Sequence, residues 1–251
     1  MLSRSSDTPA RASGPVATGA RARPVPGARP WQHAPMTWHE VLRGELADAL
    51  ADAAPDAPTL CEGWQARHLA AHVVLREHSA AVGLGLLAAR VSSLADRRVE
   101  RLADTVTDED AYRALVARVS DRPPAWHPAA WAGDATNLVE FFVHAQDVRR
   151  GAGPVPPRAV DPDLDDRLWR WAVRAARLRL RRVRAGVVLV RDDGVRASVR
   201  RPRGEGGDGE STVVVRGAPG ELVLLLTGRG AAADVSLEGP GADALTAVLP
   251  V

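Results

Sequence analysis

The stretch Asn137-Leu-Val-Glu-Phe-Phe-Val-His-Ala-Gln-Asp-Val-Arg-Arg150 combines helical periodicity with two side chains that can bind a metal ion. Glu140 and His144 are four residues apart, so they project from the same face of the predicted helix. Asp147 extends this face by another turn. Such a pair predicts a divalent-metal site if a neighbouring element adds a third ligand. The alternative is a surface Glu–His pair, which short spacings also produce by chance.

The third ligand is expected from Pro58-Thr-Leu-Cys-Glu-Gly-Trp-Gln-Ala-Arg-His-Leu-Ala-Ala-His72. His72 follows Leu69 by three residues on the apolar side of a second predicted helix, where an unpaired imidazole would be costly. Two histidines and a glutamate from two helices would suit Zn²⁺ and leave a position open for water or substrate. Asp147 fits two roles, which stay open here: it orients a ligand imidazole, or it pairs with Arg150 on the helix surface.

Outward from these stretches, the period of the apolar residues divides the chain into two parts. Up to about residue 184 the period is helical, and after Gly186 it becomes typical of strands. Helices are predicted from Trp38 to the loop at Pro55 and at 65–87, 91–104, 107–120, 134–150 and 161–184. Strands are predicted at 187–191, 195–200, 212–216 and 235–237, with helices at 219–227 and 242–248. The sequence therefore predicts an α+β protein, with a helical bundle at 36–185 and a small α+β domain at 186–251.

Local signals refine three of these helices. Thr37 and Glu40 have the spacing of a capping box, and Thr107 with Asp110 predicts a second N-terminal cap. In the helix at 161–184, the residues expected to face inward are Leu164, Leu168, Trp171, Ala175 and Leu178. Residues 1–35 are rich in Ala, Pro, Gly, Ser and Arg without hydrophobic periodicity, which predicts a disordered tail. Met36 precedes the cap directly, so we expect translation to start there.

Composition excludes several classes of protein. The 251 residues contain one cysteine, Cys61, which excludes an internal disulfide framework and a cysteine-rich zinc site and favours a cytoplasmic location. No apolar run approaches the roughly 20 residues needed to cross a bilayer. The chain has 33 basic and 31 acidic side chains, but five arginines and only one acid lie in residues 1–35. The remaining 28 basic and 30 acidic residues give no basic surface for nucleic acid.

Both quoted stretches resemble the two signatures of the DinB-like, mycothiol-dependent maleylpyruvate isomerase-type proteins of actinobacteria. The chain is most similar to uncharacterised metal-binding members that begin with a Trp-His-Glu helix, and the resemblance runs from about Met36 to the C-terminus. It implies a four-helix bundle that binds one divalent metal ion, usually zinc, through His72, Glu140 and His144. It also implies that Arg229, in the C-terminal part, faces a small-molecule substrate.

The sequence departs from these relatives at two positions. His68 stands where the family usually has aspartate, so the capping carboxylate of that helix is lost, and we expect His68 to face solvent. Gln146 stands where close relatives often have glutamate, which removes a charge near the predicted site. Neither position is a proposed metal ligand.

The resemblance favours a metalloenzyme in which Zn²⁺ lowers the pKa of a bound thiol, supplied by mycothiol. The thiolate would attack a small electrophile, giving isomerisation or transfer of the thiol, with arginines holding substrate carboxylates. Two alternatives remain open: a metal-dependent hydrolase, and a non-catalytic metal-binding or sensor module. The sequence does not name the substrate.

Overall fold

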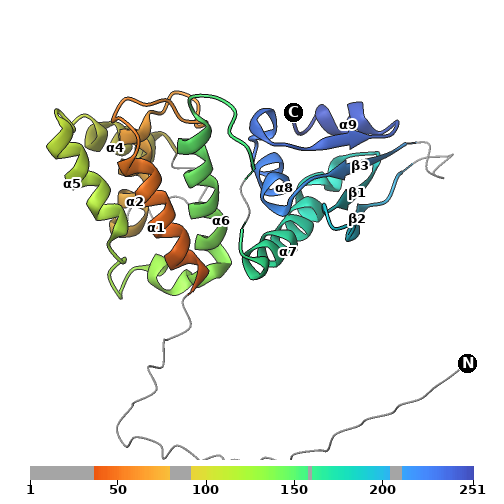
Figure 1. The fold of residues 1–251 in the computed structure, drawn as a ribbon, viewed down its shortest axis with the longest axis horizontal. Coiled ribbons are helices and arrows are strands. Elements are labelled where there is room, and N and C mark those ends of the chain that lie inside the picture. The colour runs from red at the N-terminus through yellow and green to blue at the C-terminus, as the bar shows by residue number, and fades with distance from the viewer. Residues whose placement is uncertain (1–36, 80–91, 158–159, 204–210) are drawn as a thin grey trace, which may run out of the picture. The chain divides into compact units, whose positions relative to one another are not determined.

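The computed structural model describes residues 37–79, 92–157, 160–203 and 211–251, in which helices are combined with a four-stranded sheet (Figure 1). The predicted mixture of helix and sheet is confirmed. The helices of the first part are α1 (Trp38–Ala51), α2 (Ala66–His78), α4 (Ser92–Ala103), α5 (Glu109–Ser120) and α6 (Pro128–Arg150). The predicted tail at 1–35, the start at Met36 and the part of the helix predicted at 65–87 that follows Ser79 lie outside the described residues. So do residues 204–210, between the strands predicted at 195–200 and 212–216.

The helices of the first part pack around a shared apolar core. Helix α1 contacts α5 and α6, and α2 contacts the same two helices as well as α4. Leu42, Leu46 and Leu50 of α1 are fully buried, as are Leu69 and Val73 of α2. This core fixes α2 against α6, the two helices that carry the predicted ligands.

Helix α6 contains a sharp break near its start. Gly133 has a φ of 50° and a ψ of −151°, a conformation that favours glycine. The preceding turn begins at Pro128 and is capped by His127, whose Nδ1 accepts a hydrogen bond from the Ala129 N–H at 3.2 Å. Regular helix then resumes at Asp134, which is where the sequence predicts that the helix begins.

Two of the expected helix caps were assigned to the wrong groups. The Thr37 side chain makes no capping hydrogen bond, and the Glu40 N–H donates to the Thr37 backbone carbonyl instead. The Glu40 carboxylate pairs with Arg122, a partner that a capping box does not foresee. At α5 the cap is Asp108 rather than Thr107, because a carboxylate one residue later reaches the N–H at position 111.

Helix α2 keeps an N-terminal cap despite the histidine at position 68. The Gln65 N–H donates to His68 Nδ1 at 3.2 Å, and the His68 N–H donates to the Gln65 backbone carbonyl at 2.9 Å. The capping carboxylate is absent, as the sequence predicts, but an imidazole nitrogen accepts the hydrogen bond from the N-cap N–H in its place. His68 is partly exposed.

The second part of the chain is built on the sheet. Strand β1 (Gly186–Val190) pairs with β2 (Arg196–Arg200) in antiparallel and with β3 (Thr212–Arg216) in parallel orientation, and β4 (Ser236–Glu238) pairs antiparallel with β3, giving the order β2-β1-β3-β4. The central strand β1 is an unbroken apolar run, as expected for a strand covered on both faces. The helices of this part are α7 (Pro162–Arg179), α8 (Pro219–Leu226) and α9 (Ala242–Thr246).

Helix α7 packs against α8 and also contacts β2. Its buried residues, Leu164, Leu168, Ala172 and Ala176, follow an i, i+4 spacing that turns slowly around the helix. Leu178 falls outside this stripe and is 62% exposed, so its predicted inward orientation was wrong. The division of the chain at residue 185 stays a prediction. No helix within the described residues is long and apolar enough to cross a membrane.

Candidate metal centre

Two imidazoles, one from each of two helices, converge on one carboxylate oxygen of Glu140. His72 of α2 places Nε2 3.4 Å from Glu140 Oε1, and His144 of α6 places Nε2 3.2 Å from the same oxygen. The His72 and His144 rings meet edge to face with their centroids 5.2 Å apart. The structure thus brings together all three residues that the sequence proposes as ligands, in a group that could hold a metal ion.

The positions of these side chains follow from how α2 meets the end of α6. The loop before α2 is tied to α6 by a hydrogen bond from the Leu60 N–H to the Asp147 carbonyl at 3.0 Å. Gly151, directly after α6, allows a close approach, because a Cβ atom there would lie 1.9 Å from the Pro58 carbonyl oxygen. Trp64 closes the loop and lies against His72, with ring centroids 5.2 Å apart.

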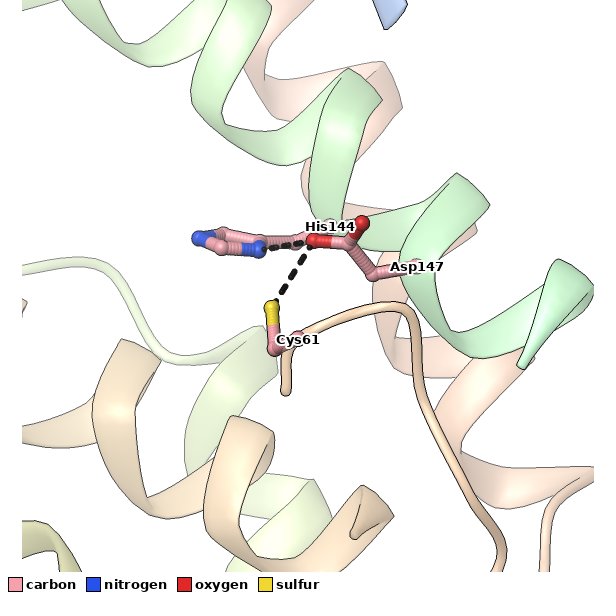
Figure 2. Close-up of side chains that lie close together, drawn as sticks. All are labelled: Cys61, His144 and Asp147. Atoms are coloured by element: carbon pink, nitrogen blue, oxygen red, sulfur yellow. Dashed lines mark hydrogen bonds and ion pairs between the residues drawn. The ribbon is translucent and has the colours of Figure 1, made fainter. Parts of the chain in front are cut away.

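Asp147 holds the imidazole of His144 from the side opposite Glu140. Its Oδ2 lies 2.9 Å from His144 Nδ1, and its side chain is fully buried (Figure 2). When His144 is neutral, an Nδ1–H that donates to this carboxylate leaves the Nε2 lone pair directed at Glu140 and His72. This is the tautomer that a metal-ligating histidine needs. The structure gives Asp147 the orienting contact, while Arg150 is bound elsewhere, by Glu221.

Asp147 also connects the site to a loop and to the C-terminal part of the chain. Cys61 Sγ donates to Asp147 Oδ2 at 3.2 Å, and Arg229 donates to both oxygens, through Nε at 2.9 Å and Nη2 at 2.8 Å. Figure 2 shows the thiol and the imidazole on the same carboxylate oxygen. The sequence did not foresee these contacts, because residues 61, 147 and 229 lie far apart along the chain and no local pattern links them.

The charges of the cluster are strongly coupled. Burial alone would raise the pKa of Asp147, but hydrogen bonds from His144 and Arg229 lower it to about 2. Burial opposes ionisation of Glu140 too, yet the His144 charge brings the pKa of this carboxyl well below its usual value. Burial acts against a charged His144, but Glu140 and Asp147 raise its pKa well above 6.5. For His72, burial has a larger effect than the hydrogen bond to Glu140, so the pKa of His72 is lowered.

The donor set fits a divalent cation. Ligand atoms about 2.0–2.1 Å from a tetrahedral Zn²⁺ lie about 3.3 Å from one another. The distances from His72 Nε2 and His144 Nε2 to Glu140 Oε1 are close to this value. Two imidazoles and one carboxylate form a ligand set typical of catalytic zinc. Arg76 adds a further contact that the sequence did not reveal, with Nε 3.3 Å from Glu140 Oε1.

A cavity of about 320 Å³ opens beside the cluster. Glu140 and His144 form its polar wall together with Thr227 and Arg229, and its apolar wall consists of Val139, Val143 and Trp171. Arg229 lines the cavity, and most of its guanidinium is engaged by Asp147. That Arg229 faces a substrate stays a prediction. Trp131 of α6 is 81% exposed and does not line this cavity.

The fold and this cluster together describe a mixed helix-and-sheet protein with a candidate metal site. Two solved structures share its fold, both crystal structures of the mycothiol-dependent maleylpyruvate isomerase, one of them a mutant. They are 18% and 19% identical to the chain, each with a TM-score of 0.54, and each alignment covers 80% of this chain and 90% of the other. No family model and no curated protein matches the chain.

Proposed function

We propose that the chain is a divalent-metal enzyme that uses mycothiol to isomerise a small electrophilic substrate or to transfer the thiol onto it. The observation that carries this proposal is the convergence of His72, Glu140 and His144 beside a cavity, with Asp147 orienting His144. The shared fold of the mycothiol-dependent isomerase supports it. In this proposal α1, α2, α5 and α6, each of which contacts two of the others, form the four-helix bundle that the resemblance implies.

The proposed ligands are His72 through Nε2, Glu140 through its carboxylate and His144 through Nε2, with Zn²⁺ as the proposed ion. Bound there, Zn²⁺ would lower the pKa of a thiol and so favour the thiolate at neutral pH. The protein contributes the orientation of the ligands. Asp147 holds the Nδ1 proton of His144, and Arg229 balances the Asp147 charge so that this buried carboxylate stays ionised.

The cavity walls suit a small substrate with an apolar portion. Val139, Val143 and Trp171 exclude water from one side, which strengthens electrostatic interactions at the reacting atoms. Arg229 donates to Asp147, Cys61 and the Thr227 carbonyl. Of its five N–H groups, these bonds leave one on Nη1 for a substrate oxygen. Arg229 thus orients Asp147 and offers one donor to the substrate.

The proposal is tested by thermal unfolding of the purified protein with zinc and with mycothiol. The thiol should raise the melting temperature of the zinc-loaded protein and leave the chelator-treated protein unchanged. S-methylated mycothiol is the matched control, because a thioether cannot form a thiolate. Stoichiometric metal without any thiol effect would reject thiol dependence and favour the hydrolase or the sensor module. Failure to bind any divalent metal would reject the proposal altogether.

A further inference from the structure

A second cavity, of about 190 Å³, adjoins the one at the candidate metal centre. It is lined by Asp134, Leu138, Arg167, Arg170, Trp171 and Arg174. Trp171 lines both cavities, and the α6 residues Leu138 and Val139 are neighbours in sequence that line one cavity each. Trp171 of α7 is therefore shared by the two cavities, each of which also has residues of α6 in its wall.

The acidic and basic groups of this second cavity do not balance. Asp134 is already engaged by Arg167, with Nη1 3.3 Å from Oδ2, and by His39, with Nδ1 2.7 Å from Oδ1. Arg167 is further bound by Asp163 at 2.9 Å. Asp134 and Arg167 are therefore already bound to other side chains.

The other two arginines are exposed and form no ion pair with a carboxylate of the described residues, although the Arg170 charge helps to lower the pKa of Asp163. Arg170 donates through Nε to the backbone carbonyl of Asp166 at 3.1 Å, which leaves both of its Nη groups. Arg174 makes no hydrogen bond or ion pair with any residue that the structure describes. The two residues are four apart on α7, so like charges stand on one face of a helix, one turn apart, and repel each other. An oxyanion between them would relieve this repulsion and accept charge-assisted hydrogen bonds.

We propose that Arg170 and Arg174 form a subsite for an oxyanion group, a carboxylate or a phosphate, of a substrate whose flat apolar portion lies against Trp171 while its reactive end reaches the candidate metal centre. This inference rests on the proposed function, because the metal centre supplies the reactive end. It assigns the recognition of the acidic group to two arginines of α7, separate from Arg229. Arginine recognises both kinds of oxyanion through the same planar fork of donors, and titration with one probe of each kind separates them.

The test is calorimetric titration of the full-length protein with benzoate and with phenyl phosphate, using benzyl alcohol as the neutral probe. We expect Arg170→Gln and Arg174→Gln each to weaken binding of one or both anions by about tenfold, the effect of losing one charge-assisted hydrogen bond. Arg177→Gln is the matched control, because Arg177 is an exposed arginine of the same helix that lines neither cavity. Whichever anion shows the arginine dependence identifies the group, and benzyl alcohol should show none.

Each titration is repeated after treatment with a chelator, which separates this inference from the proposed function. The arginine dependence should persist without metal, because the subsite contains no proposed ligand. Equal weakening in Arg177→Gln would show that only the general charge of α7 matters and would overturn the subsite. Unchanged affinity for both anions in Arg170→Gln and Arg174→Gln would overturn it as well. If the subsite behaves as expected but the protein binds no metal, the proposed function fails and the link from this subsite to a metal centre fails with it.

Discussion

Asp147 is the residue on which most of the site depends. One fully buried carboxylate accepts hydrogen bonds from His144, Cys61 and Arg229, which come from α6, the loop before α2 and the turn after α8. A buried charge of this kind is tolerated because its oxygens are bound and a guanidinium balances it. The contact to His144 also selects the tautomer that exposes Nε2 to the proposed ion.

Asp147→Asn should therefore weaken metal binding although residue 147 is not a ligand. The amide keeps the shape of the side chain but removes the charge that favours Nδ1–H on His144, and we expect about a 10–100-fold loss in zinc affinity. Competition with a chromophoric chelator measures the dissociation constant. Asp110→Asn, which removes an exposed carboxylate paired with Arg113, is the control and should leave the affinity unchanged. Equal affinity in Asp147→Asn and the unaltered protein would contradict the orienting role.

The raised pKa of His144 leads to a pH dependence of metal binding. In the metal-free protein Glu140 and Asp147 raise the pKa of this imidazole well above its usual value of 6.5. A protonated imidazole cannot act as a ligand. Binding must release that proton, so zinc affinity should fall by about tenfold per pH unit below the pKa of His144. His72, whose pKa is lowered, should not contribute near neutral pH. Titrations between pH 6 and pH 8 measure the slope, and a flat profile would contradict this coupling.

Among the elements, the junction between the loop before α2 and the end of α6 sets the distance between the proposed ligands. Gly151 ends α6 against Pro58, and the Leu60 N–H is bound to the Asp147 carbonyl. Any side chain at position 151 must push the loop away and with it the start of α2. The geometry of the site thus depends on a glycine that offers no ligand atom.

Gly151→Ala should destabilise the protein by about 1–3 kcal/mol, the usual cost of inserting a methyl group into a packed junction. Gly44→Ala is the opposite case, because a Cβ at this position of α1 would meet no atom within 4 Å, and alanine there should stabilise by about 0.5–1 kcal/mol. Thermal or urea unfolding of both variants measures the difference. A neutral Gly151→Ala would show that the loop is not held in this position.

The elements were predictable from sequence to the extent that local signals determine them. The apolar period locates the helices and strands, and the spacing of Glu140 and His144 indicates which face of α6 carries the candidate ligands. The helix caps were less predictable. Asp108 and His68 form the capping hydrogen bonds, but neighbouring residues in the sequence could equally have formed them. Arg229 and Cys61 meet Asp147 through tertiary packing alone, so only the fold could reveal that contact.

At the scale of the molecule from residue 37 onward, the C-terminal part supports the candidate centre without supplying a proposed ligand. Arg229 follows α8 and binds Asp147 on α6, and Phe142 of α6 meets Gly220 of α8 so closely that a Cβ there would lie 2.7 Å from the ring. The helical part and the sheet part are therefore joined beside the site. A substitution in one part should therefore change the stability of contacts in the other.

A double-mutant cycle on Asp147 and Arg229 measures this support. Arg229→Gln leaves the buried carboxylate without its balancing charge, and removal of one partner of such a pair costs about 3–5 kcal/mol when both are fully buried. Because Arg229 is partly exposed, we expect a smaller loss, and less than additive losses in Asp147→Asn with Arg229→Gln. Urea unfolding gives the free energies. Strictly additive losses would show that the two residues act independently.

The most direct measurement of the central claim is the metal content of ligand variants by elemental analysis. His72→Ala and His144→Ala should lose stoichiometric zinc, and Glu140→Gln should bind it more weakly, because each residue supplies a ligand that the others cannot replace. His68→Ala is the control on the same helix: it removes the α2 cap, at a cost of about 1 kcal/mol, but no proposed ligand. Full zinc content in His68→Ala with none in His72→Ala is the predicted result. Full zinc content in His72→Ala and His144→Ala would contradict the account.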